Sequence, residues 1–266
     1  MDYKVLKDKT VRWIQDWFSE NGPESPAVIG ISGGKDSTIV AALCVEALGA
    51  GRVIGVSIPD TDQDSLEAKA VADTLGIKLY IFPIAQVTDE FRKKCNFCMG
   101  SEKTAKIGEE NLNQSEQNLP ARLRMCVLYY ISQQLGGRVA NTCNLSEDYI
   151  GYCSRWGDEV GDFSPLGKLT VTETRGIGEA LGLPRELVWK VPDDGLPHSK
   201  PDEEKFGFSY EELDSVIRTG DCRNYDSKNK IMNMHWKSRF KWQSLNLPTF
   251  NPRLYVYCGS THYYGD

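Results

Sequence analysis

Residues 27–38, AVIGISGGKDST, decide the fold of this chain. An apolar run typical of a buried strand stops before Gly33 and Gly34, and a polar stretch at Asp36 then begins a helix. The two glycines permit backbone angles and a close ligand approach that a side chain would prevent. The peptide N–H groups of residues 32–37 then converge at a helix N-terminus, which favours anions. The stretch therefore predicts a strand, an anion-binding loop and a helix.

The spacing of this loop excludes two common nucleotide-binding motifs. Gly30 to Lys35 is one residue shorter than G-x-x-x-x-G-K-[ST] and an Asp follows the Lys, and the stretch does not match G-x-G-x-x-G. A carboxylate beside a bound phosphate would be repelled unless a divalent cation stood between them, so Asp36 predicts Mg²⁺. The alternative is an ordinary turn in which Asp36 only caps the next helix.

Apolar runs alternate with helical patterns along the chain. Buried strands are predicted at 28–31, 52–58, 78–82 and 138–141. Apolar residues at helical spacing predict helices at 38–48, 65–75, 121–135, 172–181, 210–218 and 227–240. This alternation predicts an α/β fold, a Rossmann-like parallel sheet with helices on both faces, and a ligand at the carboxyl ends of the strands. The polar segments 95–118 and 191–205 are predicted to be loops.

Composition excludes several classes of protein. The chain has 266 residues and a formal net charge of -6, which argues against a nucleic acid partner. No signal peptide is evident, and no apolar run approaches the ~20 residues that span a bilayer, so a cytoplasmic protein with no membrane partner is expected. The eight cysteines are expected to be reduced, with Cys44 and Cys126 buried in apolar segments. Cys95-x-x-Cys98 lacks a second pair that would complete a zinc site.

Three later segments carry charge that fits the same site. Arg122 and Arg124 are predicted at the start of an apolar helix, where the helix dipole disfavours cations, so they are expected to face an anion. Residues 141–162 follow a strand and have a density of carboxylates expected of a hard-cation site, namely Glu147, Asp148, Asp158, Glu159 and Asp162. A solvated acidic loop is the alternative. The third segment, 202–214, begins acidic and continues as a helix.

In this order, the segments resemble the motifs of one enzyme family. S-G-G-x-D-S resembles the phosphate loop of the N-type ATP pyrophosphatases. A-R-x-R-M, N-x-S-E-x-x-x-G-Y-x-x-x-x-G-D-x-x-x-D and D-E-x-x-x-G-x-x-Y-x-x-L-D, between residues 121 and 214, resemble ammonia-dependent NAD synthetase. The resemblance implies an adenine nucleotide alpha hydrolase-like fold. It also implies the ATP- and Mg²⁺-dependent amidation of deamido-NAD (nicotinic acid adenine dinucleotide) with ammonia, which gives NAD, AMP and pyrophosphate as the last step of NAD biosynthesis.

Matched position by position, the resemblance implies roles for individual residues. ATP would contact Gly30, Ile31, Ser32, Gly33, Gly34, Lys35, Asp36, Ser37 and Thr142. Deamido-NAD would contact Arg122, Arg155, Asp162 and Lys241. Asp36 and Glu147 would hold Mg²⁺, and Asp158 would lie with Asp36 at the reacting centre. The chain departs from the family at Val171, where a lysine usually contacts ATP phosphate, at Asp193, where a threonine contacts ATP, and at Phe240, where a histidine is usual. Lys168 could replace the missing lysine.

The implied reaction proceeds through an acyl adenylate. The nicotinic acid carboxylate attacks the α-phosphorus of ATP and releases pyrophosphate, and ammonia then displaces AMP. Positioning and electrostatic stabilisation of the leaving group would dominate, and Asp158 is hypothesised to orient ammonium or to take its proton. The resemblance fills 1–266 with a single synthetase domain and leaves no room for a glutaminase domain, so free ammonia is the expected nitrogen source. Family homodimers imply a substrate site shared between two subunits.

Two other functions remain open at the level of the sequence. The first is another ATP pyrophosphatase that amidates or thiolates a different carboxylate or base. That function and NAD synthesis are distinguished by whether Arg122, Arg155 and Asp162 line one dinucleotide cleft. The second is a nucleotide-binding module without catalysis. The presence of both Asp36 and Glu147 argues against this module, since an ATP sensor does not require two magnesium carboxylates.

Overall fold

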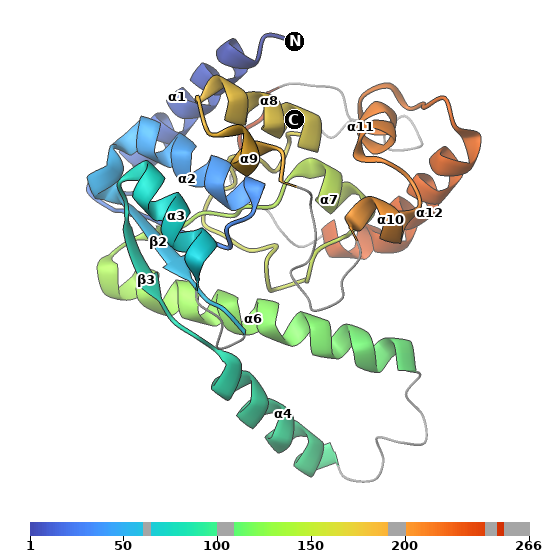
Figure 1. The fold of residues 1–266 in the computed structure, drawn as a ribbon, viewed down its shortest axis with the longest axis horizontal. Helices are drawn as coiled ribbons and strands as arrows, with labels where there is room; N and C mark the ends of the chain where they lie inside the picture. The colour runs from blue at the N-terminus through green and yellow to red at the C-terminus, as the bar shows by residue number, and fades with distance from the viewer. Residues whose placement is uncertain (61–64, 100–108, 191–200, 243–248, 253–266) are drawn as a thin grey trace.

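A parallel sheet forms the centre of the molecule (Figure 1). The structure is a computed structural model and describes residues 1–60, 65–99, 109–190, 201–242 and 249–252. The four strands lie in the order β3-β2-β1-β4 and all pair in parallel. They are β1 (Ala27–Gly30), β2 (Val53–Ser57), β3 (Lys78–Ile81) and β4 (Arg138–Val139). The predicted strands are confirmed, although β4 is shorter than expected. The strand order reverses at β1, so the loop after β1 lies where α/β sheets bind ligands.

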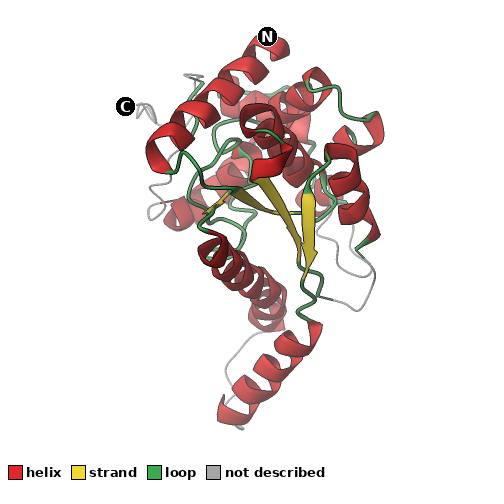
Figure 2. Ribbon diagram, turned by 90° about the vertical axis from the view of Figure 1, so that its left-hand side faces the viewer, coloured by secondary structure: helices red, strands yellow, loops and turns green. Residues whose placement is uncertain are grey.

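Helices cover both faces of the sheet, as predicted (Figures 1 and 2). Val28 of β1 and Val56 of β2 pack against Leu128 and its apolar neighbours on α6 (Glu109–Leu135). Ala27 and Ile29, which alternate with Val28, point to the opposite face. That face is covered by α1 (Tyr3–Asn21), α2 (Lys35–Leu48), α3 (Leu66–Leu75) and α8 (Val171–Ala180).

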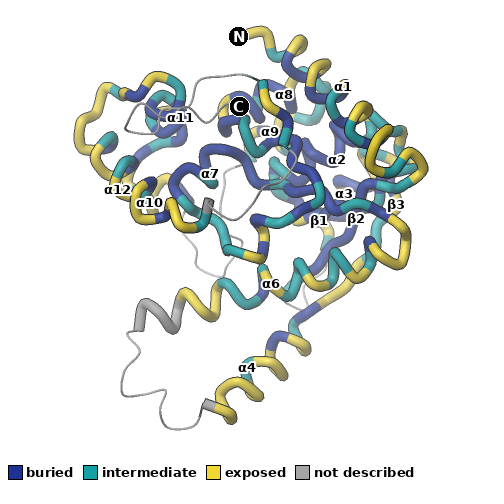
Figure 3. The backbone as a smooth tube through the Cα atoms, turned by 180° about the vertical axis from the view of Figure 1, so that it is seen from behind, coloured by how far each residue is buried: buried dark blue, intermediate teal, exposed yellow. Residues whose placement is uncertain are grey.

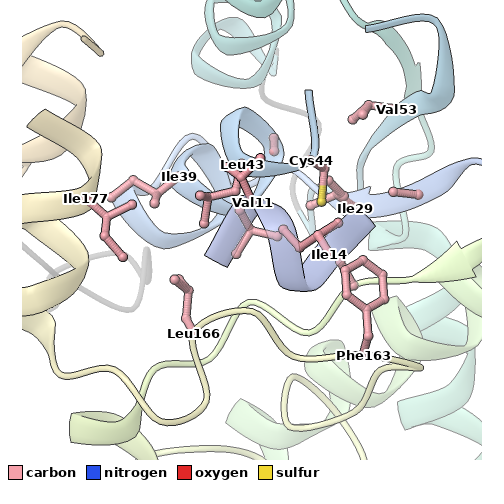
Figure 4. Packing of buried hydrophobic residues seen from close by; sticks show 14 of the residues in the cluster. Val11, Ile14, Ile29, Ile39, Leu43, Cys44, Val53, Phe163, Leu166 and Ile177 are labelled. Carbon is pink, nitrogen blue, oxygen red and sulfur yellow. The ribbon is translucent and has the colours of Figure 1, made fainter. Parts of the chain in front are cut away.

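The main hydrophobic core lies between the sheet and α1 and α2 (Figure 4). Val11, Ile14 and Phe18 recur at helical spacing on α1, and Asp2 caps this helix by accepting hydrogen bonds from two backbone N–H groups. The α1 side chains meet Ile29 of β1 and Phe163. The packing of α2 in this core fixes the position of its N-terminus at the end of β1.

A second hydrophobic core joins the remaining helices. It contains side chains from α7 (Leu145–Ile150), α11 (Tyr210–Thr219) and α12 (Tyr225–Trp242). Two short helices, α9 (Arg185–Val188) and α10 (Asp202–Phe206), and the 3₁₀ turn η1 (Ala50–Arg52) complete the described elements. Figure 3 shows that β1 and α7 are mostly buried, whereas one further helix, α4 (Ala85–Met99), is largely exposed.

The prediction that 95–118 forms a loop is wrong at both ends. Helix α4 (Ala85–Met99) continues through Cys95 and Cys98, and α6 begins at Glu109 and runs through Pro120. These two helices form an arm that projects from the sheet (Figure 1). The polar side chains at 114–117, which favoured a loop, are exposed on α6, and residues 100–108 of the predicted loop lie outside the described residues. The predicted loop 191–205 is wrong over 202–205, which belong to α10, and residues 191–200 lie outside the described residues.

The cysteines agree with the sequence expectation in most respects. The seven cysteines among the described residues are free thiols, and Cys44 is buried. Cys126 was expected to be buried and is exposed, because its side of α6 faces away from the sheet. Within the described part of the chain, no helix is long and apolar enough to cross a membrane.

Candidate active site at the carboxyl ends of the strands

The loop after β1 has the geometry of an anion-binding site. Gly33 has φ +80°, a conformation that side chains disfavour. The Ser32 hydroxyl accepts a hydrogen bond from the Gly34 N–H at 3.1 Å and lies 3.3 Å from the Ser37 hydroxyl. The N-cap residue of α2 is Gly34, which has no side chain, so the first N–H groups of the helix are not capped from within. Asp36 therefore does not act as the cap, and the alternative of an ordinary capped turn is not supported.

Asp36 and Glu147 interact electrostatically with each other and with the buried Lys35 of this loop. The Lys35 ammonium donates to Asp36 Oδ2 at 2.5 Å, and only 3% of the Lys35 side chain is exposed. Burial lowers the pKa of Lys35, but the charges of Asp36 and Glu147 outweigh that effect and raise it. Burial, followed by repulsion from Asp36, raises the pKa of Glu147 to about 8. Lys35 therefore does not neutralise both carboxylates, and a further cation would stabilise their charged forms.

The position of Glu147 follows from local sequence. Asn144 caps α7 by accepting from the Glu147 N–H at 3.2 Å, and Glu147 Oε2 accepts from the Asn144 N–H at 3.4 Å. This reciprocal capping box fixes Glu147 in the first turn of α7, which faces the phosphate loop. The motif N-x-S-E therefore encodes both the start of the helix and the orientation of its carboxylate.

The arrangement fits a magnesium ion held together with a polyphosphate. Asp36 Oδ1 is buried and has no hydrogen-bond partner among the described residues. No group of three or more His, Cys, Asp or Glu side chains in the described ranges could hold a metal ion by itself. The acidic segment 141–162 therefore brings no three such side chains together, and its role as a hard-cation site stays a prediction that depends on Asp36 and a bound phosphate. Mg²⁺ usually takes one or two carboxylates, several waters and substrate phosphates, and Asp36 and Glu147 can provide the protein share.

The loop between α7 and residue 162 connects this centre to α6. Arg122 Nε donates to the Arg155 carbonyl at 3.2 Å, and the Ser154 N–H donates to Asp158 Oδ1 at 2.8 Å. Burial raises the pKa of Asp158 against the opposing hydrogen bonds from Ser154. A carboxyl group with a raised pKa can exchange a proton closer to neutral pH. Trp156, next to the Arg155 guanidinium, has φ +61°, which marks a strained backbone at this loop.

The remaining sequence-predicted residues lie around this loop with different contacts. Lys241 on α12 donates to the carbonyls of Gly151 and Cys153 at 2.6 and 2.7 Å. Asp162 accepts from the Val139 N–H at 2.7 Å, so its carboxylate is tied to the end of β4. The Arg122 side chain therefore meets the Arg155 backbone, whereas Asp162 is hydrogen-bonded to the end of the sheet and to Tyr129 of α6. Thr142 lies between β4 and α7, beside the buried Asn141.

The helix-dipole argument for Arg122 and Arg124 is wrong, because α6 begins at Glu109 and both residues lie inside it. Arg124 was expected to face an anion, but its Nε donates to the Ile58 carbonyl at 2.9 Å. Burial lowers the pKa of Arg124.

The departures from the family pattern have clear structural consequences where they are described. Val171 is fully buried in the second hydrophobic core at the start of α8, so no cation stands at this position. The Lys168 carbonyl accepts from Arg218 at 2.8 Å, and Phe240 is about half exposed. Asp193 lies outside the described residues.

Sequence reasoning missed several charged side chains at the phosphate loop. The Lys190 ammonium donates to the Gly33 carbonyl at 3.3 Å and to Glu67 at 2.6 Å. Tyr210 lies below Lys35 and donates its hydroxyl to the buried Asp202 at 3.2 Å. Tyr210 and Asp202 belong to the sequence motif at 202–214, whereas none of the motifs contains Glu67 or Lys190.

Comparisons with known proteins agree with this geometry. The family model described as NAD synthase matches residues 6–244. The NH(3)-dependent NAD(+) synthetase of Methanocaldococcus jannaschii is 35% identical over 216 residues, which is 80% of each chain. That of Archaeoglobus fulgidus is 33% identical over 248 residues, 91% of this chain and 95% of the relative.

Solved structures give the same picture. An NMN synthetase from Francisella tularensis superimposes with a TM-score of 0.79 at 27% identity and covers 94% of this chain and 100% of that one. An NH3-dependent NAD synthetase from Campylobacter jejuni superimposes with a TM-score of 0.71 at 25% identity and covers 93% and 99%.

Proposed function

The chain belongs to the NAD synthase family, and on that premise we propose that it is an ammonia-dependent NAD synthetase that amidates deamido-NAD at the expense of ATP. The observation that carries this proposal is the meeting of Asp36 and Glu147 beside an uncapped helix N-terminus at the switch point of the sheet. A nucleotide sensor has no need for two carboxylates that repel each other. A ligase that binds Mg²⁺ and a triphosphate does.

The phosphate loop would bind ATP and orient it for attack. Backbone N–H groups of residues 32–37 would hold the phosphates, and Gly30 and Ile31 would place the nucleotide close to the end of β1, with Thr142 as a further contact. Asp36 and Glu147 would hold Mg²⁺, which neutralises the phosphates and stabilises the charge that develops on pyrophosphate. Lys35 keeps Asp36 in place through its 2.5 Å hydrogen bond. This part of the site activates the α-phosphorus for the nicotinate carboxylate.

The segment after α7 would bind the second substrate. Arg122 and Arg155 are joined by a hydrogen bond and supply positive charge for the phosphates of deamido-NAD. Asp162 and Lys241 would make the other contacts, and Lys241 is held by two carbonyls of the same segment. Asp158, whose pKa is raised by burial, would orient ammonium or accept its proton before the amine attacks the acyl adenylate.

We propose that two subunits share the substrate site. The arm of α4 and α6 exposes large apolar side chains that a monomer would leave in water, namely Phe91, Phe97 and Tyr130. A second copy that covers the arm would bury them. A single synthetase domain over 1–266, free ammonia as the nitrogen source and a cytoplasmic location stay predictions from the sequence.

The proposal is tested by incubating the purified chain with ATP, MgCl₂, deamido-NAD and ammonium chloride. NAD, AMP and pyrophosphate should appear in equal amounts and should require all four components. Formation of ADP and phosphate instead, or the absence of NAD from a preparation that still binds ATP, would contradict the proposal.

Nicotinic acid mononucleotide is the second candidate substrate. The observation that favours it is the similarity to the NMN synthetase of Francisella tularensis over the whole length of that protein. Both substrates carry the same reacting carboxylate, so the chemistry at Asp36 and Glu147 is unchanged. The ratio of kcat/KM for deamido-NAD to that for nicotinic acid mononucleotide separates the two, and our proposal expects it to exceed one.

A further inference from the structure

Lys190 holds a cation at the edge of the phosphate loop. It follows α9, which packs against α2 and α8, and its ammonium lies 3.3 Å from the Gly33 carbonyl and 2.6 Å from Glu67 Oε2. About a third of the Lys190 side chain is exposed, and Glu67 is more exposed still. The contact therefore lies at the solvent-facing side of the loop, where a phosphate chain that leaves the loop amides would pass.

A second cation, Arg175 of α8, lies in the same region. Its guanidinium stacks over Trp189 at 5.0 Å, and the Trp189 indole N–H is fixed by a 2.8 Å hydrogen bond to Glu179. The Arg175 Nε is buried with no hydrogen-bond partner among the described residues. The Arg175 charge also acts on Lys35, which places it close to the phosphate loop. Arg175 thus has a fixed orientation and an unused donor.

A polyphosphate bound at the loop requires more positive charge than one Mg²⁺ ion supplies. Lys35 is buried and neutralises Asp36, so its charge is not available to a ligand. Glu67 lies against Gly33 and would repel a phosphate unless a cation compensated its charge. A triphosphate with one Mg²⁺ keeps net negative charge, and a hydrogen-bonded ammonium is an effective partner for it.

We propose that Lys190, with Arg175 beside it, binds the β and γ phosphates of ATP and holds pyrophosphate as it leaves. This role rests on the proposed function and adds two phosphate-binding residues that none of the sequence motifs contains. When ATP binds, the Lys190 ammonium exchanges its contact with Glu67 for a phosphate oxygen, and the Glu67 carboxylate turns to solvent. The α-phosphate and adenine remain with the loop amides and the end of β1.

Calorimetric titration of ATP, pyrophosphate and AMP into Lys190→Met in the presence of Mg²⁺ tests the assignment. Loss of one charged hydrogen bond should weaken ATP and pyrophosphate about tenfold or more and leave AMP unchanged, because AMP lacks the β and γ phosphates. Lys190→Arg should restore most of the affinity. Lys228→Met is the matched control. Lys228 lies on α12, away from the phosphate loop, and it also pairs with an exposed carboxylate, that of Asp221, at 3.1 Å. The control variant should bind all three ligands like the wild type.

Glu67→Gln separates binding from a structural role. If Lys190 acts only by holding Glu67 in position, Glu67→Gln should weaken ATP binding as much as Lys190→Met does, and this result would overturn the inference. We expect Glu67→Gln to bind ATP at least as well as the wild type. ATP affinity unchanged by Lys190→Met, or ATP and AMP weakened equally, would also overturn it. A wild-type chain that does not bind ATP would refute the proposed function itself, a result distinct from a Lys190 variant that binds ATP normally.

Discussion

Replacement of Gly33 by alanine should damage the phosphate loop for two separable reasons. An L side chain at φ +80° costs about 1–2 kcal/mol. The new Cβ would also lie 2.5 Å from Glu67 Cβ and 2.8 Å from Glu67 Oε2, and overpacking of this kind costs roughly 1–3 kcal/mol. Gly33→Ala should therefore lower the free energy of unfolding by about 2–5 kcal/mol. Movement of the loop away from Glu67 should also abolish measurable ATP binding.

Gly76 provides a matched control for this experiment. It has a left-handed backbone with φ +65° and ψ 29°, but a Cβ at that position meets no atom within 4 Å. Gly76→Ala should therefore show only the conformational cost of about 1–2 kcal/mol in urea unfolding and should bind ATP normally. If Gly33→Ala is no less stable than Gly76→Ala and still binds ATP, the close approach of Glu67 to the loop is refuted.

Other consequences of the structure are open to direct measurement. Asp36→Asn and Glu147→Gln should each abolish pyrophosphate release and keep the fold, and release by both variants would refute the magnesium assignment. Without Mg²⁺, the free energy of unfolding should fall as pH rises from about 5 towards 8. The reason is that folded Glu147, with its pKa of about 8, keeps a proton that the unfolded chain loses. Glu147→Gln should make this slope shallower, and the part that remains comes from other buried carboxyl groups with raised pKa values, such as Asp148 and Asp158. Glutamine alone should not support NAD formation, and turnover with it comparable to that with ammonium would contradict the expected nitrogen source. The thermal midpoint should rise with protein concentration, whereas an active 29.9 kDa species in sedimentation would exclude the shared site.

The sheet and its ligand-binding end were predictable because local chemistry encodes them. Ala27, Val28 and Ile29 place apolar side chains on both faces of β1, which indicates a strand buried on both sides, and Gly33-Gly34 follows shortly after. The capping box at Asn144 and Glu147 makes the start of α7 a local property as well. In these places short-range sequence and tertiary contacts favour the same structure.

The arm could not be predicted in the same way. Residues 109–118 are polar and precede Pro120, two features that usually indicate a loop, yet α6 continues through the proline. Helix formation there depends on packing farther along α6, where Leu123 and Val127 meet the sheet. Lys190 and Glu67 escaped detection because they are far apart in sequence and meet through the packing of both α9 and α3 on α2.

The central claim is that the carboxylate of deamido-NAD is activated by ATP through an acyl adenylate before ammonia attacks. Deamido-NAD labelled with ¹⁸O in the nicotinate carboxylate tests it most directly. The account predicts that each NAD formed leaves one ¹⁸O atom in the phosphate of AMP, because that carboxylate oxygen attacks the α-phosphorus, and none in pyrophosphate. Label in pyrophosphate or inorganic phosphate, or NAD formation with unlabelled AMP, would contradict it.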